Sequence, residues 1–383
     1  MGAKMSVGQR VIMLLSNPFE PDVRVLKEAR TLVGVGMQVT VLCWDRLGKF
    51  PTEEQGSINV RRLRIRSNYG GGVNLVWKFI RFNLALIARV LREEVDIIHC
   101  HDLDTLPAGF VAAKLKRKAL VYDEHETEYF TQLPGLLRRT FEWIERFIAR
   151  RADLVLVTNQ LQVKKIQPML PAGRSPVEIK NCPLSAFFHA PVPEEKSTVT
   201  LGWIGYLQRG TGMERLVRLF DRLGQRHPDL TLLLVGKVHP SFAQELARAL
   251  AAARYRDRIE RVEAVPYDEV YPWYRRLDIA VMLYEDMIQF RLNTPTKLFE
   301  AMAHGIPVVA TAIGDVKEIV ASHQCGFVVD CDDELEMEQR LETLIIDRAL
   351  RWQLGKNGYE AAKRLYNWER MADRLIKSYE HLR

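Results

Sequence analysis

NTPTKLFEAMAHGIPVV, residues 293–309, contains a polar loop, a short helical segment, a turn at Gly305 and an apolar strand. A loop that leads into a helix offers an anion its backbone N–H groups and the positive end of the helix dipole. Lys297 adds a compact charge there, and Glu300 lies on about the same helix face. The stretch predicts a site for a phosphate and a sugar in an α/β domain, although its spacing also fits a solvated ion pair on an ordinary helix.

The bulk composition is typical of a folded protein with two domains. A chain of 383 residues fits two domains of roughly 180 residues, each large enough to bury its own core. The five cysteines are scattered without CxxC spacing and no secretory signal is recognisable, which predicts reduced thiols in a cytoplasmic protein. No run of about 18 apolar residues is present, so no transmembrane helix is expected.

The net charge of +7 comes from the first half of the chain. Residues 1–190 hold 28 Lys/Arg against 19 Asp/Glu, whereas residues 191–383 hold 27 against 29. Segments 74–92 and 136–151 mix Trp, Phe and Leu with Arg at helical spacing, which fits either helices that bind an anionic membrane surface or packed helices with basic outer faces. No nucleic-acid-binding motif is recognisable, so no nucleic-acid partner is predicted.

The pattern near the amino terminus predicts a strand at 11–15, a helix at 22–33 and a strand at 39–44. Such a unit implies parallel strands joined by a right-handed crossover. Its first turn reads SNPFEPDVR and lacks the G-x-G-x-x-G fingerprint, which disfavours an NAD-dependent dehydrogenase. Asp22 is placed to cap the helix, and Arg24 is a candidate contact for a substrate phosphate.

Two further predicted strands, 96–102 and 119–122, end in polar side chains. These side chains belong to His101, Asp102, Asp123, His125 and Glu126. The carboxyl ends of parallel strands meet at one edge of a sheet, so we expect the side chains to converge on a cleft. Structural histidines in the core and a metal site are the alternatives, but the spacing fits no standard zinc motif and we predict no metal.

The second half opens with a predicted strand at 198–205 and a glycine-rich loop, YLQRGTG, at 206–212. Gly205 and Gly210 permit close approach of the backbone to a ligand, and Arg209 supplies a bidentate donor for a phosphate. A glycine-rich turn between a strand and a helix is common, so this signal gains weight only together with the opening stretch.

The opening stretch resembles the donor-site signature P-x-K-x-x-E-x-x-x-x-G-x-P-V-V of the retaining glycosyltransferases of family 4. That family usually has a second glutamate eight residues before the one matched by Glu300, where this chain has Leu292. One branch reads N-T-P-T-K-L-F-E without the upstream acid, as this chain does. The segments D-x-R-V-x-K-E-A from Asp22, H-x-H-D around His101 and D-x-H-E from Asp123 are also similar to family segments.

The resemblance implies an α/β protein of GT-B architecture, in which two Rossmann-like parallel-sheet domains face each other across a cleft. We expect an acceptor-side domain at 1–190 and a nucleotide-sugar domain at 198–366. The polar, proline-containing stretch 184–197 is the expected linker, and the helix 367–383 is expected to rejoin the first domain.

The resemblance also implies roles for individual residues. On the donor side these are Gly205, Arg209, Gly210, Asn293, Thr294, Pro295, Thr296, Lys297 and Glu300. On the acceptor side they are Asp22, Arg24, Asp102, His125 and Glu126. Catalytic roles fall to His101, Arg209, Lys297 and Glu300, with His101 positioning the sugar or the acceptor while the leaving phosphate takes the acceptor's proton.

The implied activity is transfer of a sugar, with retention of configuration, from a UDP- or GDP-sugar to a glycan or lipid-linked glycan. No cofactor or metal is needed, and the expected context is the synthesis of cell-surface polysaccharide by a cytoplasmic protein that is peripheral at the inner face of the plasma membrane. Two alternatives stay open. One is a nucleotide-sugar 2-epimerase, and the other is a member of the fold that binds a nucleotide or a glycan without catalysis.

Overall fold

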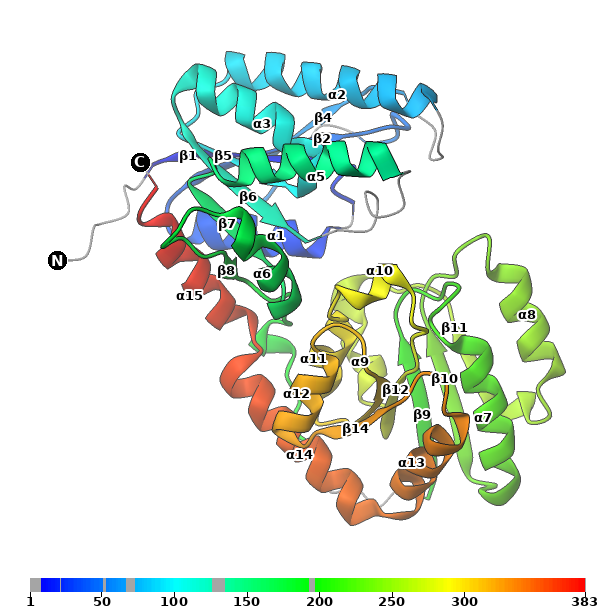
Figure 1. The fold of residues 1–383 in the computed structure, drawn as a ribbon. Helices are drawn as coiled ribbons and strands as arrows, with labels where there is room; N and C mark the ends of the chain where they lie inside the picture. Colours follow the sequence, from blue (N-terminus) through cyan, green and yellow to red (C-terminus); the bar gives the residue numbers. More distant parts are fainter. Residues whose placement is uncertain are drawn as a thin grey trace. The chain divides into compact units, whose positions relative to one another are not determined.

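The structure is a computed structural model that describes residues 8–20, 22–50, 53–66, 73–125, 135–192 and 197–382 (Figure 1). The chain forms two compact units. Unit 1 comprises residues 1–180 and 371–383, and unit 2 comprises residues 181–370. Each unit is an α/β domain built on one sheet.

The sheet of unit 1 has the strand order β3-β4-β2-β1-β5-β6-β7-β8. Neighbouring strands are parallel, except that β3 is antiparallel to β4. The strands are β1 (Arg10–Leu15), β2 (Gln38–Trp44), β3 (Glu53–Gln55), β4 (Ile58–Leu63), β5 (Ile97–His101), β6 (Ala119–Glu124), β7 (Leu154–Val157) and β8 (Val177–Glu178). From β4 to β7 the order is that of a doubly wound Rossmann sheet.

Helices cover both faces of this sheet (Figure 1). They are α1 (Val23–Gly34), α2 (Val73–Arg92), α3 (Asp102–Lys116), α5 (Gly135–Ala149), α6 (Gln160–Ile166) and the part of α15 (Trp368–Tyr379) that follows Met371. Alternate strand residues such as Ile98, Cys100 and Tyr122 join a core with α2, α3 and α5. The residues between them, including His99, His101 and Asp123, therefore point to the other face, because side chains alternate along a strand.

Unit 2 has a fully parallel sheet with the order β11-β10-β9-β12-β13-β14, again a doubly wound arrangement. Its strands are β9 (Val199–Ile204), β10 (Leu230–Val235), β11 (Ile259–Val262), β12 (Ile279–Met282), β13 (Val308–Thr311) and β14 (Gly326–Val329). Its helices are α7 (Met213–Arg226), α8 (Ala243–Ala252), α9 (Tyr271–Tyr274), α10 (Ile288–Arg291), α11 (Thr296–Ala303), α12 (Val316–His323), α13 (Glu334–Ile346) and α14 (Arg348–Leu365). The predicted pair of Rossmann-like domains is confirmed.

The units divide between Lys180 and Asn181, ten residues before the boundary expected from the sequence. Specific contacts hold the intervening segment to unit 2. The ring of Phe187 stacks on Tyr271 with 3.9 Å between centroids, and the His189 N–H donates to Ala303 O at 3.0 Å. Among the described residues, no helix combines the length and the apolar character needed to cross a membrane.

Candidate functional site

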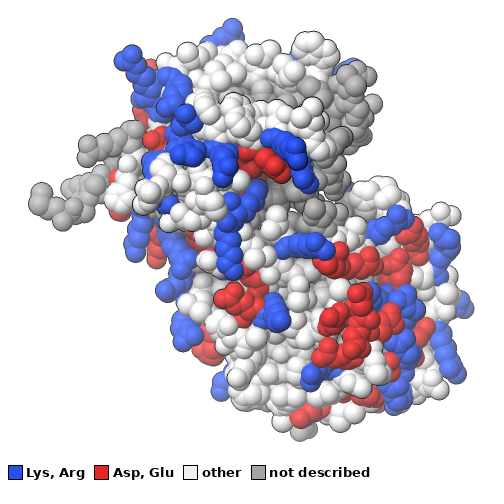
Figure 2. Space-filling model, in the orientation of Figure 1, with Lys and Arg blue, Asp and Glu red and all other residues white. Residues whose placement is uncertain are grey.

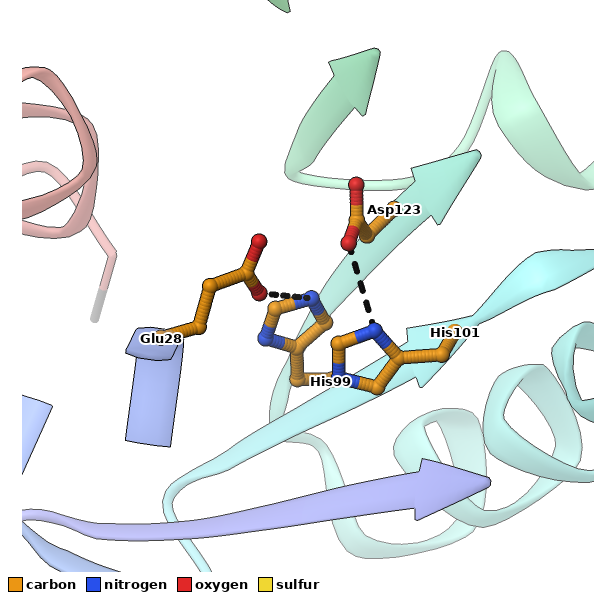
Figure 3. A group of neighbouring side chains, drawn as sticks. All are labelled: Glu28, His99, His101 and Asp123. Carbon is orange, nitrogen blue, oxygen red and sulfur yellow. Dashed lines mark ion pairs between the residues drawn. The ribbon is translucent and has the colours of Figure 1, made fainter. Parts of the chain in front are cut away.

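Unit 1 gathers four ionisable side chains at the carboxyl-terminal edge of its sheet (Figure 3). His99 and His101 come from β5, Asp123 from the adjacent β6, and Glu28 from α1. His101 and Asp123 are register partners across the two strands, which places their side chains on the same face. All four are buried, so their charges interact with little screening by water.

Arg24 of α1 balances the acids of this cluster. Its guanidinium donates two hydrogen bonds to the carboxylate of Asp123, at 2.7 and 3.0 Å, and lies 3.1 Å from Glu28 Oε1. A third bond, of 2.8 Å, reaches Ile179 O. Burial alone would raise the pKa of Asp123, but the Arg24 charge and the hydrogen bond with His101 hold it well below its usual value. Asp123 is therefore an anion held by a buried fork of N–H donors.

The two β5 histidines differ in their surroundings. His101 Nδ1 lies 3.2 Å from Asp123 Oδ2, while His99 Nδ1 is 2.7 Å from the hydroxyl of Tyr379 in α15. Burial lowers the pKa of both rings, but for His101 the hydrogen bond with Asp123 and the charge of Glu28 outweigh it and raise the pKa. His101 Nε2 is buried and has no hydrogen-bond partner among the described residues. It is therefore a ring nitrogen left over for a ligand.

Asp102 and His125 form a second pair beside this cluster. The Asp102 carboxylate accepts the His125 N–H at 2.9 Å and lies 3.4 Å from His125 Nε2. Asp102 has φ +62°, a left-handed conformation that is uncommon for residues other than glycine and that often marks a functional site. At this position β5 passes directly into α3, which begins at Asp102.

The remaining acceptor-side predictions have different outcomes. Asp22 is the N-cap of α1, where its carboxylate accepts the Val25 N–H at 3.1 Å and the Asn17 side-chain amide at 2.8 Å. Glu126 lies outside the described residues. Glu28 and Tyr379 are buried partners in the cluster that the sequence reasoning did not single out as site residues.

Unit 2 brings the opening stretch against the end of β9. Lys297, in the first turn of α11, lies so close to Gly205 that a Cβ added to the glycine would overlap Lys297 Cε. Gly205 has φ +142°, a conformation that side chains rarely adopt. Lys297 Nζ is 3.5 Å from the Tyr284 hydroxyl and 5.1 Å from the centre of the Trp203 ring. The lysine thus lies at the switch point of the sheet, between β9 and β12, where ligands bind in this class of fold.

Glu300 is buried on the same helix and is held by aromatic neighbours. Tyr274 donates to Glu300 Oε2 at 2.6 Å. Burial is the main cause that raises the pKa of Tyr274, and the negative charge of the Glu300 carboxylate raises it further. His304 Nδ1 lies 2.8 Å from the Glu300 backbone oxygen. Glu300 is thus buried and bonded to Tyr274, which does not fit the solvated ion pair with Lys297 that was considered as an alternative.

The loop at 293–296 packs tightly on the turn before α12. A Cβ on Gly314 would overlap Asn293 O, and Thr294 Oγ1 accepts the Asp315 N–H at 3.3 Å. Pro295 is the N-cap of α11 and Thr296 its first residue, so Thr296 and Lys297 both lie in the first turn. The backbone of the loop is therefore held at the positive end of a helix.

Arg209 points elsewhere in this structure. Its side chain is 66% exposed and forms an ion pair with Glu245 of α8. The adjacent Gly210 has φ +83°, and a Cβ there would overlap the Met287 sulfur. Gly210 thus packs closely against neighbouring side chains, and Arg209 forms an ion pair with a surface acid, while the approach of this loop to a ligand stays a prediction.

Two family profiles match the chain. The profile described as "Glycosyl transferase 4-like domain" matches residues 21–181, and the one described as "Glycosyl transferases group 1" matches residues 198–347. Each half of the chain is thus similar to a family of glycosyltransferase domains. The two matched regions correspond closely to the two units of the structure.

A curated relative of these domains is the D-inositol 3-phosphate glycosyltransferase of Pseudarthrobacter chlorophenolicus. It is 30% identical over 189 residues, which cover 48% of this chain and 43% of the relative. The chain spans about half the length of this relative and of two further curated relatives that it matches.

Solved structures resemble the chain over nearly its whole length. Sucrose-phosphate synthase from Thermosynechococcus elongatus has a TM-score of 0.80 at 18% identity and covers 97% of this chain and 98% of its own. Anabaena HepE, solved in complex with UDP-glucose, has a TM-score of 0.73 at 18% identity, with coverages of 96% and 98%. At these identities the likeness concerns the fold, and it supports the GT-B architecture of the chain.

Proposed function

We propose that the protein is a retaining glycosyltransferase that moves a sugar from a nucleoside diphosphate donor to an acceptor. The observation that carries the proposal is the placement of Lys297 against Gly205, with Glu300 buried one turn later on α11. A cation at a helix start suits a diphosphate, and a buried carboxylate suits the hydroxyls of a ribose or a sugar.

On the donor side, the residues would stabilise the departing diphosphate. Preorganised donors lower a transition state by meeting charge as it develops. Lys297 and the 293–296 loop supply such donors. Arg209 would join them by leaving Glu245, an exchange that costs little because water screens an ion pair this exposed.

On the acceptor side, His101 would position the transferred sugar or the acceptor through its unpartnered Nε2. Asp102 and His125 lie beside it and, with Asp22 and Glu126, stay candidates for acceptor hydroxyls. The guanidinium of Arg24 is occupied by Asp123, Glu28 and Ile179 O, so we propose that Arg24 orients the cluster rather than binding a phosphate.

We propose that transfer needs no metal ion. The four clustered groups, Glu28, His99, His101 and Asp123, have ligand atoms within 4.8 Å of one another and could in principle hold one. The guanidinium of Arg24 already lies between the two acids, and a divalent cation would have to displace or approach this charge. Arg24 thus offsets part of the acidic charge of the cluster without a metal.

Unit 1 carries a surface suited to an acceptor at an anionic membrane. Trp77 and Leu84 of α2 are 65% and 60% exposed, and Leu136 and Trp143 of α5 are 82% and 62% exposed. The same two helices carry Lys78, Arg81, Arg89, Arg92, Arg138, Arg139 and Arg146. Figure 2 shows this face as largely uncharged surface bordered by basic side chains. Exposed aromatic residues among cations are typical of helices that lie in a membrane interface, which supports a lipid-linked glycan as acceptor.

The donor proposal is tested by thermal unfolding with UDP, GDP, ADP, CMP and NAD at saturating concentration. A ligand that binds only the folded chain raises its apparent stability. We expect a shift with UDP or GDP that is lost in Lys297→Ala and weakened in Glu300→Gln. No shift with any nucleoside diphosphate, or an unchanged shift in both variants, would contradict the donor site.

Product analysis then separates the proposed transfer from the alternatives that share the fold. A donor sugar that appears on an added acceptor supports transfer, whereas an epimerised donor without acceptor identifies a nucleotide-sugar 2-epimerase. Nucleotide binding with no turnover under any acceptor would identify a binding protein. The test for a binding protein is included for two reasons. Arg209 is paired with Glu245, and Leu292 stands where the family usually has a glutamate.

A further inference from the structure

Unit 2 contains a cavity at the opposite edge of its sheet from Lys297. It lies at the amino-terminal ends of β12 and β13, where Asp278 and Pro307 line it, whereas Gly205 follows the carboxyl end of β9. Its volume is about 370 Å³, within the range of small-molecule sites. We call it the arginine cavity, because its lining includes Arg275, Arg348 and Arg351.

The arginine cavity has an excess of positive charge. Asp278 is its one acidic lining residue, and the Asp278 carboxylate accepts the Thr200 N–H at 2.9 Å. Among the described residues no ion pair engages Arg275, whereas its neighbour Arg276 pairs with Glu260. Burial lowers the pKa of Arg351, and the nearby charge of Arg348 lowers it further, although Asp278 opposes the effect. An anion in the cavity would relieve this repulsion.

A neutral acceptor atom lies beside these cations. His304 Nδ1 faces the backbone oxygen of Glu300 at 2.8 Å, so Nδ1 carries the hydrogen and Nε2 carries a lone pair. His304 is 5% exposed, and its Nε2 has no partner among the described residues. Burial lowers the pKa of His304 to about 4, so the ring stays neutral at physiological pH. A hydroxyl group is the natural complement of such a lone pair.

We propose that the arginine cavity binds a small phosphorylated sugar or polyol, with its phosphate among the arginines and its hydroxyls toward His304. Arginine forks match phosphate oxygens better than lysines do, because they donate in pairs from one plane. The indole nitrogen of Trp352, another lining residue, is also buried without a partner and adds a donor to the same wall.

The cavity shares two wall residues with the support of Glu300. Tyr274 and His304 both line it, and they bond respectively to the carboxylate and the backbone oxygen of Glu300. Helix α11 has eight residues, so the cavity and the helix start are about 12 Å apart along it. If the proposed function holds, an occupied cavity changes nucleotide affinity, and by linkage the nucleotide changes the affinity of the cavity equally.

The binding proposal is tested by calorimetric titration of glucose 6-phosphate into the full chain. The decisive comparison is Arg275→Glu against Arg276→Glu, adjacent exposed arginines of which only the first lines the cavity. We expect Arg275→Glu to weaken binding at least about tenfold and Arg276→Glu to change it less than about twofold. Glucose without phosphate should bind at least about tenfold more weakly than glucose 6-phosphate.

Lys297→Ala separates the cavity from the donor site. It should keep glucose 6-phosphate binding, whatever it does to nucleotide binding. The proposed cavity site would be overturned if the unaltered chain does not bind glucose 6-phosphate, or if Arg275→Glu and Arg276→Glu weaken binding equally. It would also be overturned if Lys297→Ala abolishes glucose 6-phosphate binding while Arg275→Glu retains it. Melting temperatures of all variants confirm that they are folded. A nucleotide titration that is unchanged by saturating glucose 6-phosphate would overturn only the link to Glu300.

Discussion

At the scale of single residues, Gly205 decides whether the donor lysine can lie where it does. Its φ of +142° and the closeness of Lys297 leave no room for a side chain. The sequence predicts that the backbone at this glycine comes close to a ligand. In the structure, this backbone comes close to the side chain of Lys297. Both requirements depend on the absence of a Cβ.

We predict that Gly205→Ala lowers nucleotide affinity at least about tenfold, because the new methyl group displaces Lys297. The strained backbone should also cost about 1–2 kcal/mol of unfolding free energy. The matched control is Gly34→Ala at the end of α1, where an added Cβ meets nothing within 4 Å. Nucleotide titration and urea unfolding measure the two effects, and equal affinity in both variants would contradict the prediction.

His125 gives a pH dependence whose sign follows from its burial. Burial lowers its pKa to about 4, whereas a histidine in an unfolded chain has a pKa of about 6.5. Between these values the unfolded chain binds a proton that the folded chain does not. The stability contributed by neutral His125 is therefore present above about pH 6.5 and is lost as the pH falls toward 4.

We predict that His125→Asn reduces the loss of unfolding free energy between pH 7 and pH 4.5, by at most about 3 kcal/mol. Urea unfolding at the two pH values measures this difference. His381→Asn, at an exposed position, serves as the control. An acid-induced loss in His125→Asn equal to that of the unaltered chain would show that this ring does not titrate on unfolding.

At the scale of elements, helix α1 is tied to the sheet of unit 1 by charge as well as by packing. Arg24 reaches β6 through two hydrogen bonds to Asp123, while Val25, Ala29 and Leu32 of the same helix are fully buried. A buried pair contributes little net stability when both partners are present, but losing one partner leaves an uncompensated charge. The pair therefore specifies how α1 lies on the sheet more than it adds stability.

We predict that Arg24→Ala destabilises the protein by about 3–5 kcal/mol, because Asp123 is left buried without its counterion. Adding Asp123→Ala should recover much of this loss. Arg30→Ala, on the exposed side of the same helix, should change stability by less than about 0.5 kcal/mol. An equal loss in the single and double variants, measured by urea unfolding, would mean that the pair is not coupled.

At the scale of the whole molecule, the basic excess predicted for the first half of the sequence lies in unit 1. There the exposed apolar residues of α2 and α5 accompany it. In unit 2, Arg218, Arg222 and Arg226 of α7 are instead paired with Glu334, Glu338 and Glu342 of α13. Charge in unit 2 is thus largely neutralised locally, while that of unit 1 is left to attract an anionic surface.

We predict that vesicles containing anionic lipid, but not neutral vesicles, carry the protein upward in a flotation gradient. Trp77→Ala with Trp143→Ala should weaken this binding at least about tenfold, because both exposed rings are lost. Tyr206→Ala, which removes an exposed ring from unit 2, is the control. Binding that is equal in all variants, or absent on anionic vesicles, would remove the membrane from the proposed function.

The sequence alone determined the two Rossmann-like domains, because hydrophobic runs, glycine turns and helical periodicity are local signals. It also located the polar ends of β5 and β6 and the first turn of α11, because side chains at strand ends and helix starts are set by chain direction. Only the tertiary structure joined Glu28, His99 and Tyr379 into one cluster. His99 contacts both of the others, and it is separated from Tyr379 by 280 positions in the chain. The tertiary structure likewise turned Arg209 toward Glu245, because long-range packing chooses between partners that local spacing leaves equal.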